Sequence, residues 1–244
     1  MKTIITTIIV TFAVATSLFA ADASPKDDVA AAAKKLGDKA NYSWKTTVAV
    51  PEGSRFRPGP TDGKTEKDGV THLKLSFGEN TTEAFIKGDK AAATSPDGGW
   101  QSLADLDNAE GPARFMAGML RNFKAPAAQA AELATDTKEL KADGEAIGGD
   151  LGEDRAKTLL TFRPRGGGDG PTVSNAKGSV KFWIKDGVLA KYEFKVSGKV
   201  SFNGNDRDVE RTTTTEIKDV GSTKVEVPEE AKKKLEPAPA PAAK

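Results

Sequence analysis

Side chains whose types and spacing could support catalysis are few in this 244-residue chain. His72 is its single histidine, and it has no cysteine. A serine nucleophile needs a neighbouring base, and no serine sits in a Gly-x-Ser-x-Gly pattern. The lack of cysteine excludes disulfides, thiol chemistry and cysteine-ligated zinc. His72 falls between Thr71 and Leu73, on the polar side of a predicted strand, and we interpret it as an exposed strand residue.

Two pairs of carboxylates are the next candidates for chemistry. Asp105 with Asp107, and Glu153 with Asp154, could in principle serve as a general acid and a general base. Acids that work as catalysts need a desolvated setting that perturbs their pKa. Both pairs lie in predicted turns among other charged residues. We therefore interpret them as solvated surface charges.

Two glycine-containing loops resemble ligand-binding motifs only superficially. The run from Gly166 to Gly170 has no following Lys-Ser/Thr, and Pro171 stands where a phosphate loop would begin a helix. In the stretch 203–208, Arg207 occupies a position where a calcium loop needs an oxygen ligand. The pair at 203 and 204 is Asn-Gly, which is the most favoured two-residue hairpin turn. We expect a linker and a hairpin, with no cofactor and no metal.

The charge balance gives no indication of a nucleic-acid partner. Lys and Arg total 36 against 35 Asp and Glu, so the formal net charge is +1. Basic residues alternate with acidic ones along the chain and form no stripe, which a nucleic-acid surface needs. Hydrophobic residues make up 37%, which is typical of a globular protein with its own core.

The N-terminus has the layout of a secretory signal peptide. Lys2 precedes an apolar run from Ile4 to Phe19, and alanines follow between positions 20 and 23. The apolar run is shorter than the roughly 20 residues that span a bilayer. We therefore predict a signal peptide over 1–23, cleaved after position 20, 21 or 23. The mature chain would be secreted, into the periplasm, without a transmembrane segment.

Periodicity and turn residues predict the elements of the mature chain. We expect a helix from Ser24 to about 40, a strand over 41–50 and a loop over 51–69. Further strands follow over 71–77 and, with two turns between them, within 81–103. Helices begin at Pro112 and Pro126, a hairpin surrounds Asp143-Gly144, and a short helix covers 153–160. A long antiparallel meander reaches about 218, a short strand covers 224–228, and the Pro/Ala tail 236–244 is disordered.

The meander contains the longest aromatic-rich stretch, KFWIKDGVLAKYEFKVSGKVSFNGNDRD, from Lys181 to Asp208. Side chains alternate between faces along a strand. Phe182, Tyr192, Phe194 and Phe202 are therefore predicted on the inner face, and Trp183 on the opposite face.

The order of elements predicts one α+β domain over 24–235, with an antiparallel sheet curved around or packed on helices. Such an arrangement can leave an apolar hollow, which is where apolar ligands bind. The large apolar side chains are the candidates for its walls, although an ordinary core would use the same residues. They are Trp44, Leu75, Phe85, Trp100, Phe115, Met119, Phe182, Tyr192, Phe194 and Phe202.

Four sequence segments resemble those of a known group of extracytoplasmic proteins. They are NYSWKTTV, EAFIKGDKAAATSPDGGWQSL, VKFWIKDGVLAKYEFKV and TTTTEIKDVGSTKVEVPEEAKKKL. In pattern and order they resemble the LolA-like superfamily, which includes the periplasmic lipoprotein carrier, LppX/LprG-type lipid carriers and RseB-type sensor domains. The resemblance implies a half-open β-barrel with helices packed on its concave face. The mycobacterial carriers are anchored through a cysteine, which this chain lacks.

These observations favour a non-enzymatic, exported binding protein that holds an apolar ligand such as a lipid or a lipoprotein acyl chain. Its partner would be that lipid or lipoprotein. The alternative is a protein-interaction or stress-sensing module of the cell envelope, whose inner space is filled by its own side chains and whose partner is another envelope protein. A core without a cavity would favour the alternative.

Overall fold

The computed structural model describes residues 24–54, 57–67, 69–95, 98–161, 171–202 and 204–236. The predicted signal peptide, most of the glycine-rich linker and the tail from 237 lie outside these residues, as does the side chain of Phe202. The described helices are α1 (Pro25–Gly37), α2 (Leu103–Asn108), α3 (Pro112–Arg121), α4 (Pro126–Asp136), α5 (Glu153–Leu160) and α6 (Glu229–Leu235). The strands are β1 (Asn41–Ala49), β2 (Thr61–Glu66), β3 (Thr71–Phe77), β4 (Asn80–Lys87), β5 (Lys90–Thr94), β6 (Trp100–Ser102), β7 (Lys141–Asp143), β8 (Ala146–Asp150), β9 (Thr172–Lys185), β10 (Val188–Phe202) and β11 (Asn205–Lys218).

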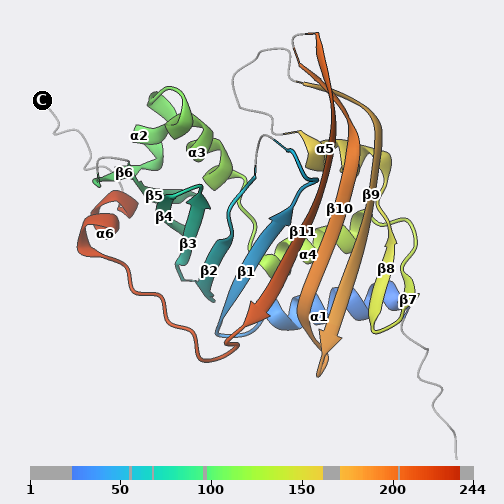
Figure 1. Cartoon of the computed structure of the whole chain (residues 1–244). Coiled ribbons are helices and arrows are strands. Elements are labelled where there is room, and N and C mark those ends of the chain that lie inside the picture. Colours follow the sequence, from blue (N-terminus) through green and yellow to red (C-terminus); the bar gives the residue numbers. More distant parts are fainter. Residues whose placement is uncertain are drawn as a thin grey trace, which may run out of the picture.

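All described strands belong to one antiparallel sheet in the order β6-β5-β4-β3-β2-β1-β11-β10-β9-β8-β7 (Figure 1). Neighbours in this order are also neighbours in sequence except at the centre, where β1 pairs with β11. There Thr46 faces Thr215, and their hydroxyl oxygens are 2.9 Å apart. The sheet is curved and not closed, so the predicted α+β class, with a curved antiparallel sheet and helices on its concave face, is confirmed.

Local sequence explains why the first helix begins where it does. The Ser24 hydroxyl accepts a hydrogen bond from the Asp27 backbone N–H at 3.2 Å, and the Asp27 carboxylate accepts one from the Ser24 backbone N–H at 3.3 Å. This reciprocal capping box, with Pro25 in the first turn, satisfies donors that the helix itself leaves free. The helix then buries Val29 and Leu36 against the sheet.

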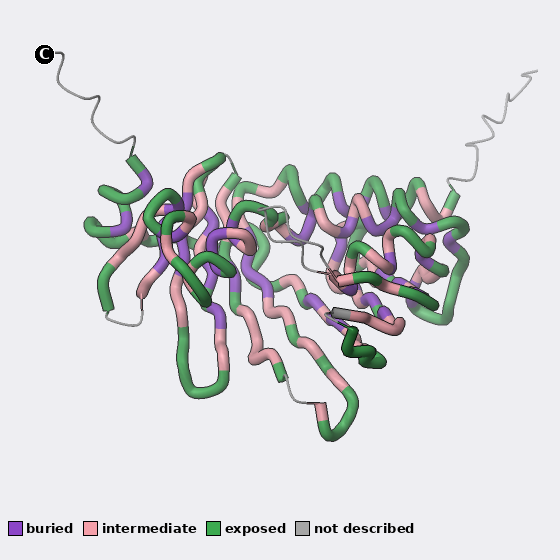
Figure 2. Tube along the Cα trace, turned by 90° about the horizontal axis from the view of Figure 1, so that it is seen from above, coloured by how far each residue is buried: buried purple, intermediate pink, exposed green. Residues whose placement is uncertain are grey.

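Helices cover the sheet in two layers of unequal extent. In Figure 1, α1, α4 and α5 lie on one side of β8–β11, and α2 and α3 extend the cover near β5 and β6. Figure 2 shows the buried residues concentrated where these helices meet the sheet. Helix α6 packs on the opposite face, where Ala231 and Leu235 bury Phe85 and Ala92. The main core therefore lies on the concave side, and a smaller second core lies beneath α6.

The expected meander is confirmed as three long neighbouring strands, β9, β10 and β11. The turn between β9 and β10 places Asp186 at φ 53° and Gly187 at φ 72°, which suits the strand twist of a tight hairpin. Trp183 lies on the opposite face from Phe182, as predicted, and the Lys191 ammonium is 4.3 Å from its ring centroid.

The prediction of a continuous loop over 51–69 is wrong, because β2 lies within it. The sequence of this strand, TDGKTE, has no large apolar residue, so the pattern gives no strand signal. Its place is fixed by neighbours on both sides, β1 and β3. Gly63 faces Trp44 in this register, and the indole ring occupies the space that a Cβ would need.

The prediction of a strand over 224–228 is also wrong, because this segment pairs with no strand. Both edges of the preceding strand β11 are already taken by β1 and β10. The segment instead crosses toward α6, held by hydrogen bonds from the Thr223 N–H to the Asn41 side chain (2.8 Å) and from the Val225 N–H to Glu66 (2.9 Å).

Asp105 and Asp107 lie in helix α2 and not in a turn. The Asp105 carboxylate accepts the Ser102 backbone N–H at 2.9 Å in a second capping box. Asp107 accepts from Arg121 of α3, Nε to Oδ1, at 3.2 Å. The predicted turn is wrong because the capping signal of Ser102 starts a helix immediately after a three-residue strand.

Candidate functional site

The inner face of the central strands is formed by aromatic and branched side chains, as predicted. Phe182 is 0% exposed, Tyr192 is 1% exposed, and Trp44 and Phe194 are almost as deeply buried. A side chain with no accessible surface touches neither solvent nor a space large enough for a water molecule. These residues belong to one buried cluster with apolar side chains of α1, α4 and α5.

One part of this core continues to the surface along α3. Trp44 stacks on Phe123, with ring centroids 6.2 Å apart and planes inclined by 19°. Phe115 and Met119 are four residues apart and lie on one side of α3. Phe123 follows two residues after the helix ends at Arg121. Phe123 and Met119 are partly buried against the core, whereas Phe115 is 45% exposed. We call these three residues the α3 stripe.

The remaining predicted lining residues divide between the two faces of the sheet. Leu75 is buried in the main core with Trp44. Phe85 and Trp100 lie on the other face beneath α6, with ring centroids 5.4 Å apart. The structure thus brings together most of the predicted residues but separates these two from them, and the side chain of Phe202 lies outside the described residues. A ligand-binding role for each stays a prediction.

His72 is not exposed, contrary to the prediction. Its ring stacks on Phe85 at 4.5 Å with nearly parallel planes, and its side chain is 22% exposed. Burial lowers the pKa of His72, although Glu83, whose carboxylate is 3.4 Å from Nε2, partly opposes this. The prediction failed because it assumed solvent on that face of β3, where α6 and Trp100 form a second core.

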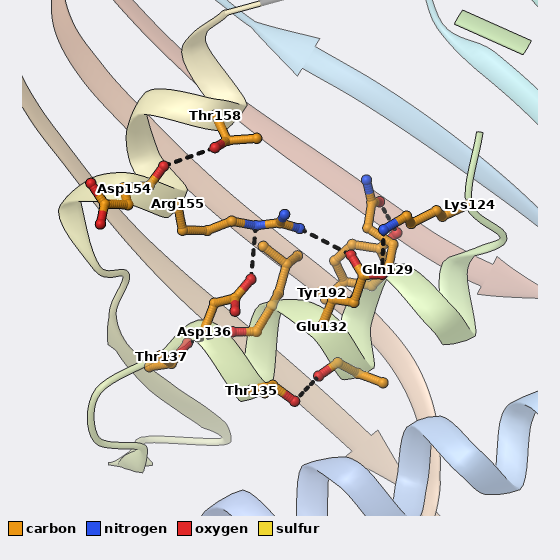
Figure 3. Close-up of polar contacts among 12 residues, drawn as sticks. Lys124, Gln129, Glu132, Thr135, Asp136, Thr137, Asp154, Arg155, Thr158 and Tyr192 are labelled. Carbon is orange, nitrogen blue, oxygen red and sulfur yellow. Dashed lines mark hydrogen bonds and ion pairs between the residues drawn. The ribbon is translucent and has the colours of Figure 1, made fainter. Parts of the chain in front are cut away.

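A polar cluster that the sequence analysis did not identify ties α4, α5 and the sheet together (Figure 3). Arg155 of α5 reaches over α4, with Nε 3.2 Å from Asp136 and Nη2 3.4 Å from Glu132. The Tyr192 hydroxyl donates to the Gln129 side-chain oxygen at 2.5 Å, and burial raises the pKa of Tyr192. The i,i+4 spacing of Glu132 and Asp136 on one helix face was the available signal.

An open hollow of about 660 Å³ lies between α1 and the ends of β8 and β9. Ala31, Lys35, Ile147 and Ile184 are among the residues that line it. None of the side chains predicted to bind a ligand belongs to this lining.

The carboxylate pairs are engaged in structural contacts. The backbone hydrogen bond from Ser102 is the largest cause that lowers the pKa of Asp105, and Lys234 adds to it at 3.2 Å. Glu153 pairs with Lys157 at 2.8 Å, which lowers the pKa of this exposed carboxyl. A general acid or base works best with a pKa near the operating pH, so these groups are poorly suited to that role.

The described ranges contain neither a metal-binding cluster nor a membrane-spanning helix. Within them, no three side chains of His, Asp or Glu gather in a way that could hold a metal ion. No helix in the same ranges is both long enough and apolar enough to cross a membrane.

Comparison with known proteins places the chain in no family. No family model matches it, and no curated protein matches it. Among solved structures it is similar to LprF from Mycobacterium bovis, with 10% identity and a TM-score of 0.45 over 85% of this chain and 97% of that one. The lipoprotein LppX from Mycobacterium tuberculosis gives 10% identity and a TM-score of 0.48 over 82% and 97%. A DUF1329 family protein from Desulfovibrio piger gives 9% and 0.33 over 79% and 89%.

All three TM-scores lie below 0.5 and the identities are near one in ten, so we transfer no role from these proteins. The resemblance to the LolA-like superfamily stays a prediction.

Proposed function

We propose that this protein is exported to the periplasm and binds an apolar ligand, such as a lipid or a lipoprotein acyl chain, without catalysing a reaction. The observation that supports this most directly is the α3 stripe. It leads from Phe115, which is 45% exposed, to Phe123, which stacks on the buried Trp44. These side chains form a continuous apolar path from the surface to the core, and contiguous apolar surface of this kind marks ligand-binding sites.

Binding would require α3 to move away from the sheet. The first turn of α3 has no side-chain cap, and its C-terminal Arg121 is bound to Asp107 of α2. We propose that α2 and α3 move as a pair, which would also break the contact between Lys234 of α6 and Asp105 of α2. An acyl chain inserted beside Trp44 would replace the contacts that the α3 stripe makes in the closed form. Burial of the acyl chain would contribute about 25 cal/mol of binding free energy for each Å² of apolar surface removed from water.

The test is a titration with a fluorescent fatty acid whose emission depends on its environment. Wild-type protein should take up the probe, and the double variant Phe115→Ser, Met119→Ser should bind at least about tenfold more weakly, because a loss of 1.4 kcal/mol suffices for that factor. Val220→Ser is the matched control, since Val220 is 41% exposed but lies beyond β11, far from α3 in the chain. Absence of wild-type binding, or an equal loss in the control, would contradict the proposal.

A second candidate function is a protein-interaction or sensing module of the cell envelope. The tight packing around Phe182 and Tyr192 favours it, because an inner face that is already filled leaves little room for a resident ligand. Native mass spectrometry of protein purified from the periplasm separates the two. A co-purifying lipid supports the carrier, whereas ligand-free protein that captures an envelope protein supports the module.

A further inference from the structure

Arg211 is a cation on the concave face of the sheet whose role the proposed function leaves open. In the pairing of β10 with β11 it stands opposite Val196, two residues beyond the pair Phe194 and Thr213. Pairs one residue apart in an antiparallel register point to opposite faces, and pairs two apart share a face. Phe194 and Val196 are both buried in the main core, so Arg211 shares their face.

The described contacts of Arg211 do not balance its charge. Its Nη2 donates to the backbone carbonyl oxygen of Leu159, in the last turn of α5. In the described part of the chain, no carboxylate lies within ion-pair distance of it. Burial lowers the pKa of Arg211, and no neighbouring charge is among the causes. Arg155, by contrast, has two carboxylates within 3.4 Å.

The bond to Leu159 gives a structural reason for part of this arrangement, since a cation at a helix C-terminus is stabilised by the helix dipole. A guanidinium nevertheless carries five N–H donors in a planar fork, and one carbonyl engages a single donor. A partly buried charge without a counter-ion is unfavourable. The same fork matches a carboxylate or phosphate in geometry and charge.

The position of Arg211 relative to Trp44 defines the shape of a ligand. Trp44 faces Ile217 across the β1–β11 pairing, and Arg211 is six residues further along β11. At roughly 3.3 Å per residue, the two side chains are separated by about 20 Å along the strand. Thr213, Thr215 and Val48 lie between them on the same face. The concave face thus has an aromatic group at one end and a cation at the other.

We propose that Arg211 binds the anionic headgroup of the ligand, whose chain extends along β1 and β11 toward Trp44 and the α3 stripe. The ligand would then be a single-chain amphiphile with a carboxylate or phosphate head. This assignment rests on the proposed function, because it needs an apolar ligand on the concave face.

The test compares three amphiphiles of equal chain length by calorimetry near neutral pH: dodecanoate, dodecyl phosphate and dodecanol. Wild-type protein should bind the two anions at least about tenfold more tightly than the alcohol, since a charge-assisted pair contributes about 1.5–3 kcal/mol. Arg211→Met keeps the length of the side chain and removes the charge. It should lose the preference for the anions while binding dodecanol as the wild type does. Arg211→Lys should keep part of the preference.

Lys199→Gln is the control for net charge, because Lys199 lies on the same part of β10 but on the other face, near Asp206. It should leave the preference unchanged. A variant Arg211→Met that weakens all three ligands equally would show that Arg211 serves only as a cap for α5, and would overturn the headgroup assignment. The same holds if acetate or inorganic phosphate alone binds Arg211 as tightly as the amphiphiles do.

The two proposals fail in different ways. If wild-type protein binds none of the three amphiphiles, the proposed function itself is wrong. If it binds all three equally and Arg211→Met changes nothing, the function stands and only the headgroup assignment is wrong.

Discussion

Trp44 of β1 contacts both the neighbouring strand β2 and the α3 stripe. Its indole lies over Gly63 of the neighbouring strand, so that a Cβ placed there would be 2.1 Å from ring carbon Cε2. The other side of the ring stacks on Phe123. The indole thus contacts both the backbone of Gly63 on β2 and the ring of Phe123.

Gly63→Ala should destabilise the fold. The methyl group overlaps the rigid indole, and overpacking of this kind typically costs about 1–3 kcal/mol. The midpoint of urea unfolding measures the change. Gly99→Ala is the matched control, because the nearest atom to its added Cβ is the Ser95 hydroxyl oxygen at 3.8 Å. If both variants unfold at the same urea concentration, the contact of Trp44 with Gly63 is not tight.

His72 should make stability depend on pH. Its pKa in the folded state is lowered below the ordinary value by burial, so the unfolded chain takes up a proton more readily. The stability that neutral His72 contributes is complete above its unfolded pKa and is lost as the pH falls toward the folded pKa. His72→Phe should unfold at a urea midpoint that changes less between about pH 7 and pH 5 than that of the wild type.

The comparison is clean because no second histidine titrates in this range. Lys87→Met, at the end of the neighbouring strand β4, should leave the slope unchanged, because Lys87 is not among the charges that shift the pKa of His72. A variant His72→Phe with the slope of the wild type would mean that the stacking on Phe85 leaves the imidazole as well hydrated as in the unfolded chain.

At the scale of the elements, helix α5 is secured on α4 by Arg155. Its guanidinium bridges Glu132 and Asp136, and its side chain is 20% exposed. Since the group is largely desolvated, the ion pairs should matter more than surface pairs do.

Arg155→Met should destabilise the protein by about 1–3 kcal/mol, because it leaves Asp136 without a cation and Glu132 with Lys124 alone. Hydrogen exchange should quicken in α5 and the adjoining part of α4 before it does in β9 and β10. Lys157→Met removes the exposed pair with Glu153 on the same helix and should change exchange far less. Equal effects of the two variants would show that apolar packing alone holds α5.

The sequence predicts those elements that carry their own pattern. Alternation and tight turns define β9–β11, and a proline followed by an apolar stripe defines α3. Strand β2 has no such pattern, since its place is set by β1 and β3 and by the indole of Trp44. The segment 224–228 has the composition of a strand, but no free strand edge is adjacent to it.

The candidate site was predictable only in part for a related reason. Along β9 and β10 polar residues alternate with apolar ones, which identifies the inner face. In β4 and β5, Phe85 and Ala92 are flanked by apolar residues, so both faces look buried, and the pattern cannot tell which face Phe85 occupies. Arg155 and Arg211 were not predicted because their positions depend on the approach of α5 to elements distant in sequence.

For the molecule as a whole, the sheet is an open one with β6 and β7 at its ends. An exposed strand edge can pair with another chain unless charges or short length prevent it. Both end strands have three residues, and β7 carries Lys141 and Asp143, the latter paired with Lys181 at 2.8 Å. The ends of the sheet are therefore protected without being closed.

The pairing of β1 with β11 also dictates when the molecule can assemble. Thr46 and Thr215 meet across 169 positions of the chain, so the centre of the sheet cannot form until the ribosome has passed Thr215. Before that moment β1–β6 and β7–β10 are two separate groups of strands, because β11 is the strand that joins them. Contacts between residues so distant in sequence slow folding. If the chain is exported as proposed, late assembly of this kind would keep it unfolded until it has passed a translocation channel.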